Sequence, residues 1–271
     1  METPNKIPVA DRHFTGNTTP ISDTNRLSQA KRRKRFICKR HIVEPPVLDY
    51  ENLNEAMVAL PEGSIILRDD RLGKSWSVDI KPVSICRYQV TRRLYSQVTG
   101  AAHASSGPDD HPIDTISWLD AAKFCNRLSA MFDLPDHYVF SSDGQDATPR
   151  TTSNGFRLPC EAEWEFACRA GTQGPRYGPI GEIAWYRENS GGGPRPVGTR
   201  RPNNWGLHDM LGNVWEWCQD IYDPAVYGTY RIFRGGGWAD NERGCLATNR
   251  RRSHPTFAID DLGFRLARSA I

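Results

Sequence analysis

Apolar residues recur at helical spacing in residues 117–132, SWLDAAKFCNRLSAMF. The stretch opens with Ser117 and has Asp120 three residues later, an arrangement typical of the capping box that begins a helix. Its apolar positions fall on one helix face: Leu119, Ala122, Phe124, Leu128 and Met131. The pattern predicts an amphipathic helix whose apolar side packs on a core.

A second helical pattern covers residues 160–170, CEAEWEFACRA. Its apolar side consists of Trp164, Ala167 and Cys168. On the other side, Glu161, Glu165 and Arg169 follow one another four residues apart, as in helices stabilised by side-chain ion pairs. Catalysis by the two glutamates is one interpretation, but the pattern favours a solvated helix face.

The remaining elements are short. Residues 64–67 and 83–90 have the apolar character of β-strands. Residues 185–238 interleave Gly, Asn and Pro with five of the eight tryptophans, namely Trp185, Trp205, Trp215, Trp217 and Trp238. This composition predicts irregular loops packed around aromatic side chains, and binding and catalytic residues tend to lie on such loops.

Composition narrows the class of protein. The 271 residues are 38% hydrophobic and 25% charged, which permits a large core and excludes a collagen, a coiled coil or a wholly disordered chain. No apolar run is long enough to span a bilayer, and the first residues lack the apolar stretch of a secretory signal. The seven cysteines include no CxxC pair, which argues against a zinc ribbon. We therefore expect a cytoplasmic protein with reduced thiols.

Charge is distributed unevenly along the chain. Residues 26–41 carry eight Lys and Arg and no acid, whereas the net charge of the whole chain is only +3. Residues 1–45 are predicted to form a flexible basic arm, and residues 46–271 a single domain. The arm could attach to nucleic acid or to an acidic partner. A solvated tail without a partner is the favoured alternative, because nothing in the acidic remainder extends the basic patch.

Several longer motifs carry a family resemblance. They are GFRLPCEAEWEFACRAGT (155–172), PVGTRRPNNWGLHDMLGNVWEW (196–217), RIFRGGGWADNERGCLATNRRR (231–252) and LGFRLAR (262–268). Together they resemble the formylglycine-generating enzyme family, also called sulfatase-modifying factor. The resemblance implies an α+β architecture, a C-type-lectin-like fold rich in irregular structure.

The motif GLHDMLGNVWEW suggests a cation site. Asp209 and Glu216 offer carboxylate oxygens, and the backbone between them offers carbonyls, a donor set that suits Ca²⁺. The family resemblance implies four calcium ligands here: Asp209, Gly212, Val214 and Glu216. The alternative is that the two carboxylates accept hydrogen bonds from loop amides without a metal.

The resemblance also indicates where a copper site would lie in this sequence. Active family members hold copper(I) between two thiolates and use O₂ to convert a cysteine of a sulfatase peptide to formylglycine. The corresponding positions here are Asp240 and Cys245, so one thiol is replaced by a carboxylate. A carboxylate is a hard ligand and a poor substitute for sulfur on copper(I). We therefore expect no bis-thiolate copper site.

What remains of the family site is a pocket. The resemblance places ten residues in or near it: Trp215, Trp238, Asp240, Asn241, Glu242, Cys245, Asn249, Arg250, Arg251 and His254. Arginines and acids orient polar groups, and aromatic side chains provide a stacking surface. This mixture suits a polar small molecule, a peptide or a protein ligand. Each residue also has a structural interpretation, such as a turn residue at His254; outside this set, Arg265 is interpreted as a salt-bridge partner.

Two function classes follow, with a third held open. We favour a non-catalytic ligand-binding module. The alternative is an oxidoreductase with altered chemistry, in which Cys245 acts as a thiolate and Asp240 as a base. The third is the sulfatase-activating enzyme itself, with a different metal arrangement.

Overall fold

The computed structural model describes residues 48–69, 72–100 and 107–269. The predicted basic arm of residues 1–45, including the charged run 26–41, lies outside these ranges. The described helices are α1 (Leu53–Ala56), α2 (Arg92–Thr99), α3 (Trp118–Met131), α4 (Glu161–Arg169), α5 (Ile180–Ile183) and α6 (Pro224–Tyr227). The strands are β1 (Met57–Ala59), β2 (Gly63–Asp69), β3 (Lys74–Ile80), β4 (Val83–Cys86), β5 (Tyr138–Phe140), β6 (Ala147–Pro149), β7 (Trp215–Ile221), β8 (Arg231–Arg234), β9 (Arg250–Ser253), β10 (Leu262–Gly263) and β11 (Ala267–Ser269).

Helix α3 begins where the capping pattern predicts. The Ser117 hydroxyl accepts a hydrogen bond from the Asp120 amide at 3.1 Å and donates one to the Asp120 carboxylate at 2.6 Å. The apolar side of the helix is buried, and the ring of Phe124 meets that of Phe264 edge-on at 5.3 Å. At its last turn, Met131 is exposed rather than packed. The prediction of an amphipathic helix is confirmed.

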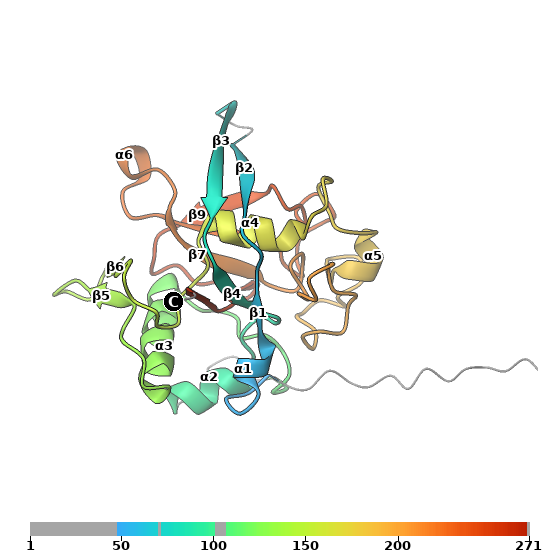
Figure 1. The fold of residues 1–271 in the computed structure, drawn as a ribbon. Coiled ribbons are helices and arrows are strands. Elements are labelled where there is room, and N and C mark those ends of the chain that lie inside the picture. Colours follow the sequence, from blue (N-terminus) through green and yellow to red (C-terminus); the bar gives the residue numbers. More distant parts are fainter. Residues whose placement is uncertain (1–47, 70–71, 101–106, 270–271) are drawn as a thin grey trace, which may run out of the picture. The chain divides into compact units, whose positions relative to one another are not determined.

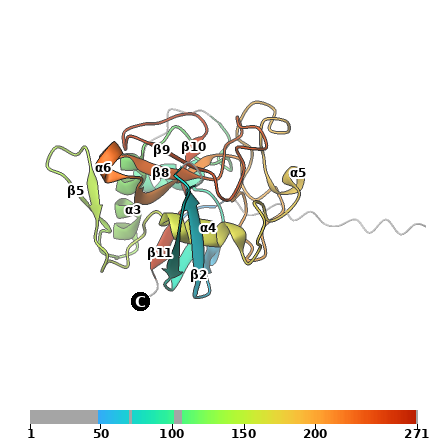
Figure 2. The same cartoon turned by 90° about the horizontal axis from the view of Figure 1, so that it is seen from above.

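Two sheets organise the domain. One has the strand order β10-β7-β8-β9, and the other has the order β1-β4-β11. In the second sheet β4 lies between the first and the last described strands and pairs antiparallel with both. Figure 1 and Figure 2 both place α4 against the β2–β3 hairpin, which forms a separate two-stranded sheet.

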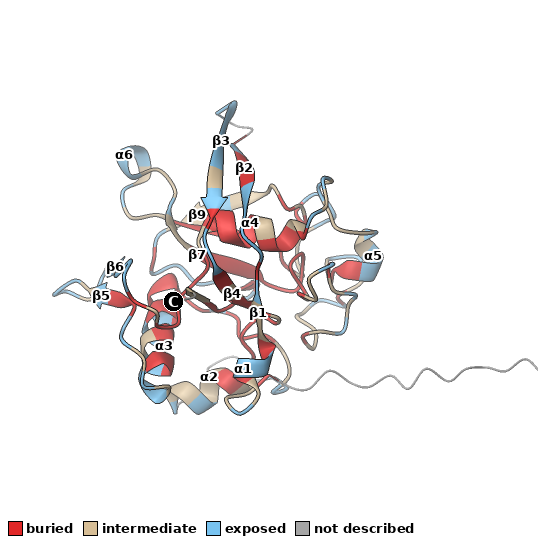
Figure 3. Cartoon of the chain, viewed as in Figure 1, coloured by how far each residue is buried: buried red, intermediate tan, exposed pale blue. Residues whose placement is uncertain are grey.

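Tryptophans fill the core around these sheets. Trp118, Trp164, Trp215 and Trp217 are almost completely buried. Each indole N–H still has a partner: Trp118 Nε1 donates to the Cys218 carbonyl at 2.9 Å, and Trp217 Nε1 donates to the Ile116 carbonyl at 2.8 Å. In Figure 3 the buried residues concentrate in β4, β7 and α4, whereas α6 is exposed. The predicted loops around aromatic anchors are thus present, with β7 as the one longer strand among them.

The prediction that one face of α4 is solvated is wrong. Glu161 and Glu165 are only 4% and 1% exposed. Arginines of β8 and β9 cover them: Arg234 contacts both glutamates, and Arg250 forms a bidentate pair with Glu161 at 2.7 Å. The pattern within the helix could not reveal this, because the covering charges come from distant strands.

A membrane-spanning segment was not expected. Among the described helices, none combines the length and the apolar character needed to cross a bilayer.

Candidate functional site

The segment after β8 positions the two residues at the family's copper positions. A turn of three glycines (residues 235–237) follows β8 and leads through Trp238 to Asp240. The Asp240 carboxylate accepts hydrogen bonds from Trp215 Nε1 at 2.6 Å, from the Gly237 amide at 3.0 Å and from Arg251 Nη2 at 3.1 Å. Because both of its oxygens accept hydrogen bonds, the Asp240 carboxylate links the glycine turn to the Trp215 indole.

Cys245 is completely buried. Burial, followed by the negative charge of Asp240, raises the pKa of its thiol to about 12. The packing around the sulfur is tight, since a Cβ on Gly236 would lie 2.8 Å from Sγ. Cys245 is therefore a protonated, enclosed thiol at neutral pH, and a thiol in this form is a poor nucleophile.

Cys245 is expected to resist alkylation by iodoacetamide at about pH 8 in the folded protein and to react readily once unfolded, because the thiolate is the reactive form. Peptide mapping by mass spectrometry would measure the modified fraction, with the unfolded chain as the control. Modification of Cys245 in the native protein at the unfolded rate would contradict this assignment.

The residues at the copper positions do not fit the ion. The Asp240 carboxylate is held by three donors and supplies oxygen where copper(I) prefers sulfur, which leaves the buried Cys245 as the one thiol of the pair. The other cysteines of the described ranges are unpaired, and no three metal-ligating His, Cys, Asp or Glu side chains gather there. A copper(I) site of two thiolates therefore cannot be assembled from Asp240 and Cys245.

Part of the predicted ligand pocket does come together around Asp240. The Arg251 guanidinium lies 4.5 Å from the centre of the Trp215 ring, so that Trp215, Asp240 and Arg251 form one cluster. Half-buried Trp238 borders this cluster, and its Nε1 donates to the Asp260 carbonyl at 3.0 Å. Trp215 itself is buried, which leaves Arg251 and Trp238 as the accessible members.

The turn between Asp240 and β9 presents polar side chains to solvent. Asn241 and Glu242 are exposed there, while the amide of Asn249 donates to the carbonyls of Arg243 and Gly244 at 2.6 and 2.9 Å and closes the turn. His254 is exposed at the end of β9, and its Nδ1 hydrogen bonds with the Thr256 hydroxyl at 2.8 Å. Asn241, Glu242 and the exposed Arg251 form a polar rim near Asp240, whereas His254 lies against the Tyr230 ring.

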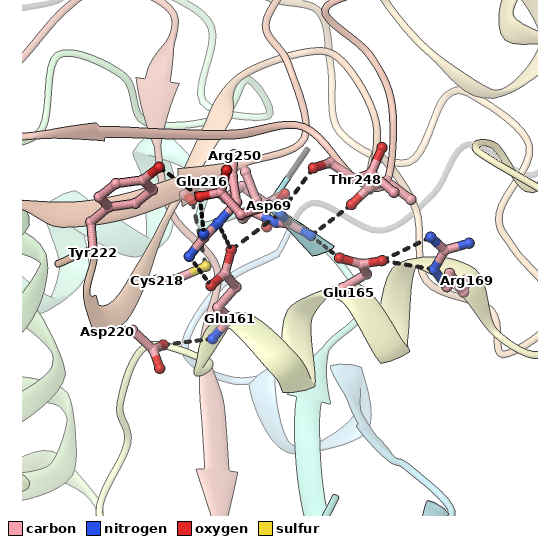
Figure 4. Close-up of polar contacts among 12 residues, drawn as sticks. Asp69, Glu161, Glu165, Arg169, Glu216, Cys218, Asp220, Tyr222, Thr248 and Arg250 are labelled. Carbon is pink, nitrogen blue, oxygen red and sulfur yellow. Dashed lines mark hydrogen bonds and ion pairs between the residues drawn. The ribbon is translucent and has the colours of Figure 1, made fainter. Parts of the chain in front are cut away.

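Arg250 does not face this rim. Successive residues of a strand point to opposite faces, so Arg250 and Arg251 diverge on β9. Arg250 pairs with Asp69 at 2.8 Å and with Glu161, and Figure 4 shows it among the side chains of this buried network. Its role is structural: it ties β9 to α4 and to the end of β2.

Two hollows lie on the Arg250 side of the sheet. A groove of about 650 Å³ runs between β2 and the loop after α4, with Ile66, Arg68 and Phe166 among its lining. A smaller hollow of about 180 Å³ is polar, and Tyr222, Asn249, Arg250 and Arg252 are among its lining residues. The sequence contains no signal for either hollow, because both depend on where the β2–β3 hairpin packs.

The predicted calcium ligands also converge. The carbonyls of Asp209, Gly212 and Val214 and one carboxylate oxygen of Glu216 all point at Gln89 Nε2, at 3.2, 3.5, 2.9 and 2.9 Å. No role was predicted for Gln89, because it lies more than a hundred residues from these ligands along the chain and nothing in its own segment indicates the contact.

The two carboxylates of the predicted calcium site differ in their surroundings. Glu216 pairs with Arg265 at 2.6 and 2.7 Å and accepts from Trp164 Nε1 at 2.7 Å. The Asp209 side chain turns away and accepts from the Gly198 amide at 2.7 Å, and burial raises its pKa to about 6. Asp209 thus contributes only its carbonyl to the four converging oxygens, and Glu216 is already balanced by a guanidinium.

Known proteins share this architecture. The mouse protein "Inactive C-alpha-formylglycine-generating enzyme 2" is 34% identical over 59% of this chain and 57% of its own length. The Streptomyces coelicolor "Formylglycine-generating enzyme" is 33% identical over 50% of this chain and 54% of its own length. The solved structure of "Treponema denticola variable protein 1" matches with a TM-score of 0.71 and 28% identity, over 79% of this chain and 95% of that one.

The small sheets, buried tryptophans and long irregular segments define a C-type-lectin-like domain of the formylglycine-generating type, as the sequence predicted. Residues 46–270 match the "Sulfatase-modifying factor enzyme 1-like domain". The chain belongs to the sulfatase-modifying factor family, whose members include the formylglycine-generating enzymes.

Proposed function

We propose that this chain is a non-catalytic, ligand-binding member of the family. The observation that carries the proposal is the arrangement of Asp240 and Cys245: a carboxylate held by three hydrogen bonds stands in place of one thiol, beside a second thiol that is completely buried. The same observation argues against the oxidoreductase alternative, which requires a reactive Cys245 thiolate. Similarity to a mouse protein named as inactive gives further support.

The proposed ligand surface is the rim around Arg251. Arg251, Asn241 and Glu242 are exposed on it, and half-buried Trp238 adds an aromatic edge. Mixed charges and amides beside an aromatic side chain suit a polar peptide or a protein segment with its own charged groups. The buried ion pairs beneath the rim hold β8 and β9 in place and give it a rigid base.

Two further parts of the proposal come from the sequence. A cytoplasmic location is one of them. Attachment of residues 26–41 to nucleic acid or to another acidic partner is the other, and a solvated tail without a partner is the alternative that the sequence favours.

The purified protein is expected to leave the cysteine of a CxPxR peptide unmodified in the presence of copper(I) and O₂. A mass-spectrometric assay measures this, with an authentic formylglycine-generating enzyme as positive control. Conversion by the unaltered chain would overturn the proposal.

Variants at position 240 test whether the carboxylate alone accounts for the expected lack of activity. Asp240→Cys restores the missing sulfur, and Asp240→Ser is the control of similar size without it. Copper binding and peptide oxidation by Asp240→Cys alone would identify the carboxylate as the change that removed the chemistry. Inactivity of both variants would trace the loss to the wider site, including the enclosed Cys245.

A further inference from the structure

Gln89 lies where the four oxygens of the predicted calcium site converge. It follows β4, is completely buried and is held in place by its neighbour, since the Val90 amide donates to the Phe264 carbonyl at 2.9 Å. Its Nε2 has its shortest contacts, 2.9 Å each, with the Val214 carbonyl and the Glu216 carboxylate. The position that a cation would need is therefore filled by a side-chain amide.

The chemistry of the surroundings fixes the orientation of this amide. An amide nitrogen carries two hydrogens and donates, whereas the amide oxygen only accepts. All four neighbours are acceptors, so the nitrogen must face them; a flipped amide would set oxygen against oxygen. Gln89 Oε1, which points the other way, has no hydrogen-bond partner among the described residues.

The charge of the site is also balanced without a metal. Calcium sites in proteins draw on several carboxylates. Here Glu216 supplies the one carboxylate oxygen of the four, and it already pairs with Arg265, which is itself completely buried. A divalent ion at the Gln89 position would lie close to that guanidinium without a second carboxylate to offset it.

We propose that the Gln89 amide replaces the calcium ion that the family resemblance places at Asp209, Gly212, Val214 and Glu216. The loop from residue 209 to residue 216 is therefore held by hydrogen bonds to a neutral side chain. The chain folds and keeps its stability without calcium. A carboxylate at position 89 restores the charge that such an ion needs.

Thermal unfolding of the full chain in millimolar Ca²⁺ and in EGTA tests the first part. The melting temperature is expected to be the same in both, and metal analysis after dialysis against calcium is expected to find none bound. A lower melting temperature in EGTA, or one calcium ion per chain, would overturn the proposal.

Gln89→Glu tests the second part. The carboxylate faces four oxygens, so the variant is expected to melt more than about 4 °C below the unaltered chain in EGTA and to recover in calcium. Gln97→Glu is the matched control, because Gln97 is exposed and its side-chain oxygen accepts from the Tyr50 amide, a role that glutamate keeps. Failure of calcium to stabilise Gln89→Glu would contradict the replacement.

Gln89→Met covers the case in which Gln89→Glu does not fold. Methionine removes the donor without adding charge, so the four oxygens lose their shared partner. We expect an equal fall in melting temperature in calcium and in EGTA. A Gln89→Met protein as stable as the unaltered chain, or one rescued by calcium, would show that the amide does not hold the loop.

Discussion

Arg265→Met is expected to lower the free energy of unfolding by about 3–5 kcal/mol, because it leaves a buried carboxylate without its counter-charge. Arg265 and Glu216 are 0% and 1% exposed, and two of their N–O distances are 2.6 and 2.7 Å. The guanidinium also donates to the carbonyls of Cys86 and His208 at 3.0 and 2.9 Å, so its loss leaves these acceptors unsatisfied as well. Urea denaturation measures the change through the midpoint and slope of the transition.

Arg251→Met is the matched control for this prediction. Arg251 also pairs with a carboxylate, that of Asp240, but its side chain is 55% exposed. Water and salt screen such a pair, so we expect a loss of about 1 kcal/mol or less. Equal losses in the two variants would show that burial does not determine the strength of these pairs.

Gly212→Ala is expected to cost on the order of 3 kcal/mol, from left-handed backbone strain and from a steric clash. Gly212 has a φ of +79°, and a Cβ at this position would lie 2.3 Å from the Trp185 carbonyl oxygen and 3.0 Å from its nitrogen. Both neighbours are backbone atoms, so they cannot swing away as a flexible side chain would. Thermal and urea unfolding of the variant would measure the loss.

Gly192→Ala separates the two contributions to the Gly212 effect. Gly192 has a similar φ of +85°, but a Cβ there would meet nothing within 4 Å. We expect a loss of about 1–2 kcal/mol from backbone strain alone. If Gly212→Ala were no worse than Gly192→Ala, the close approach of the Trp185 backbone would carry no energetic weight.

The sequence predicts helices well where the signal is local. The Ser117 cap and the apolar face of α3 both lie within the helix itself, and both are confirmed. The position of α4 was also predicted, but not the burial of its charged side. Its arginine partners lie far along the chain, with Arg234 73 residues from Glu161 and Arg250 89 residues from it. Such pairing follows from the packing of strands on a helix, which no pattern within α4 contains.

In the candidate site, too, the sequence predicts what depends on local motifs and misses what depends on tertiary packing. Motif positions identify Asp240 and Cys245, but the enclosure of the thiol depends on how the glycine turn packs against it. The family resemblance grouped Arg250 with Arg251 in one pocket, although successive residues of a strand point to opposite faces. Gln89 meets residues 209–216 only through the tertiary fold, so nothing in its own segment of the sequence indicates the contact.

The central position of β4 has a consequence for synthesis on the ribosome. Its registered partners are in β1, where Met57 pairs with Cys86, and in β11, where Ala267 pairs with Ile85. At typical elongation rates, the second partner emerges roughly 10–40 s after β4 itself. During that interval the nascent chain carries an apolar strand with one edge open, the form of exposed backbone that invites wrong pairing. Residues 83–86 therefore keep one unpaired edge until β11, the last described strand, has been synthesised.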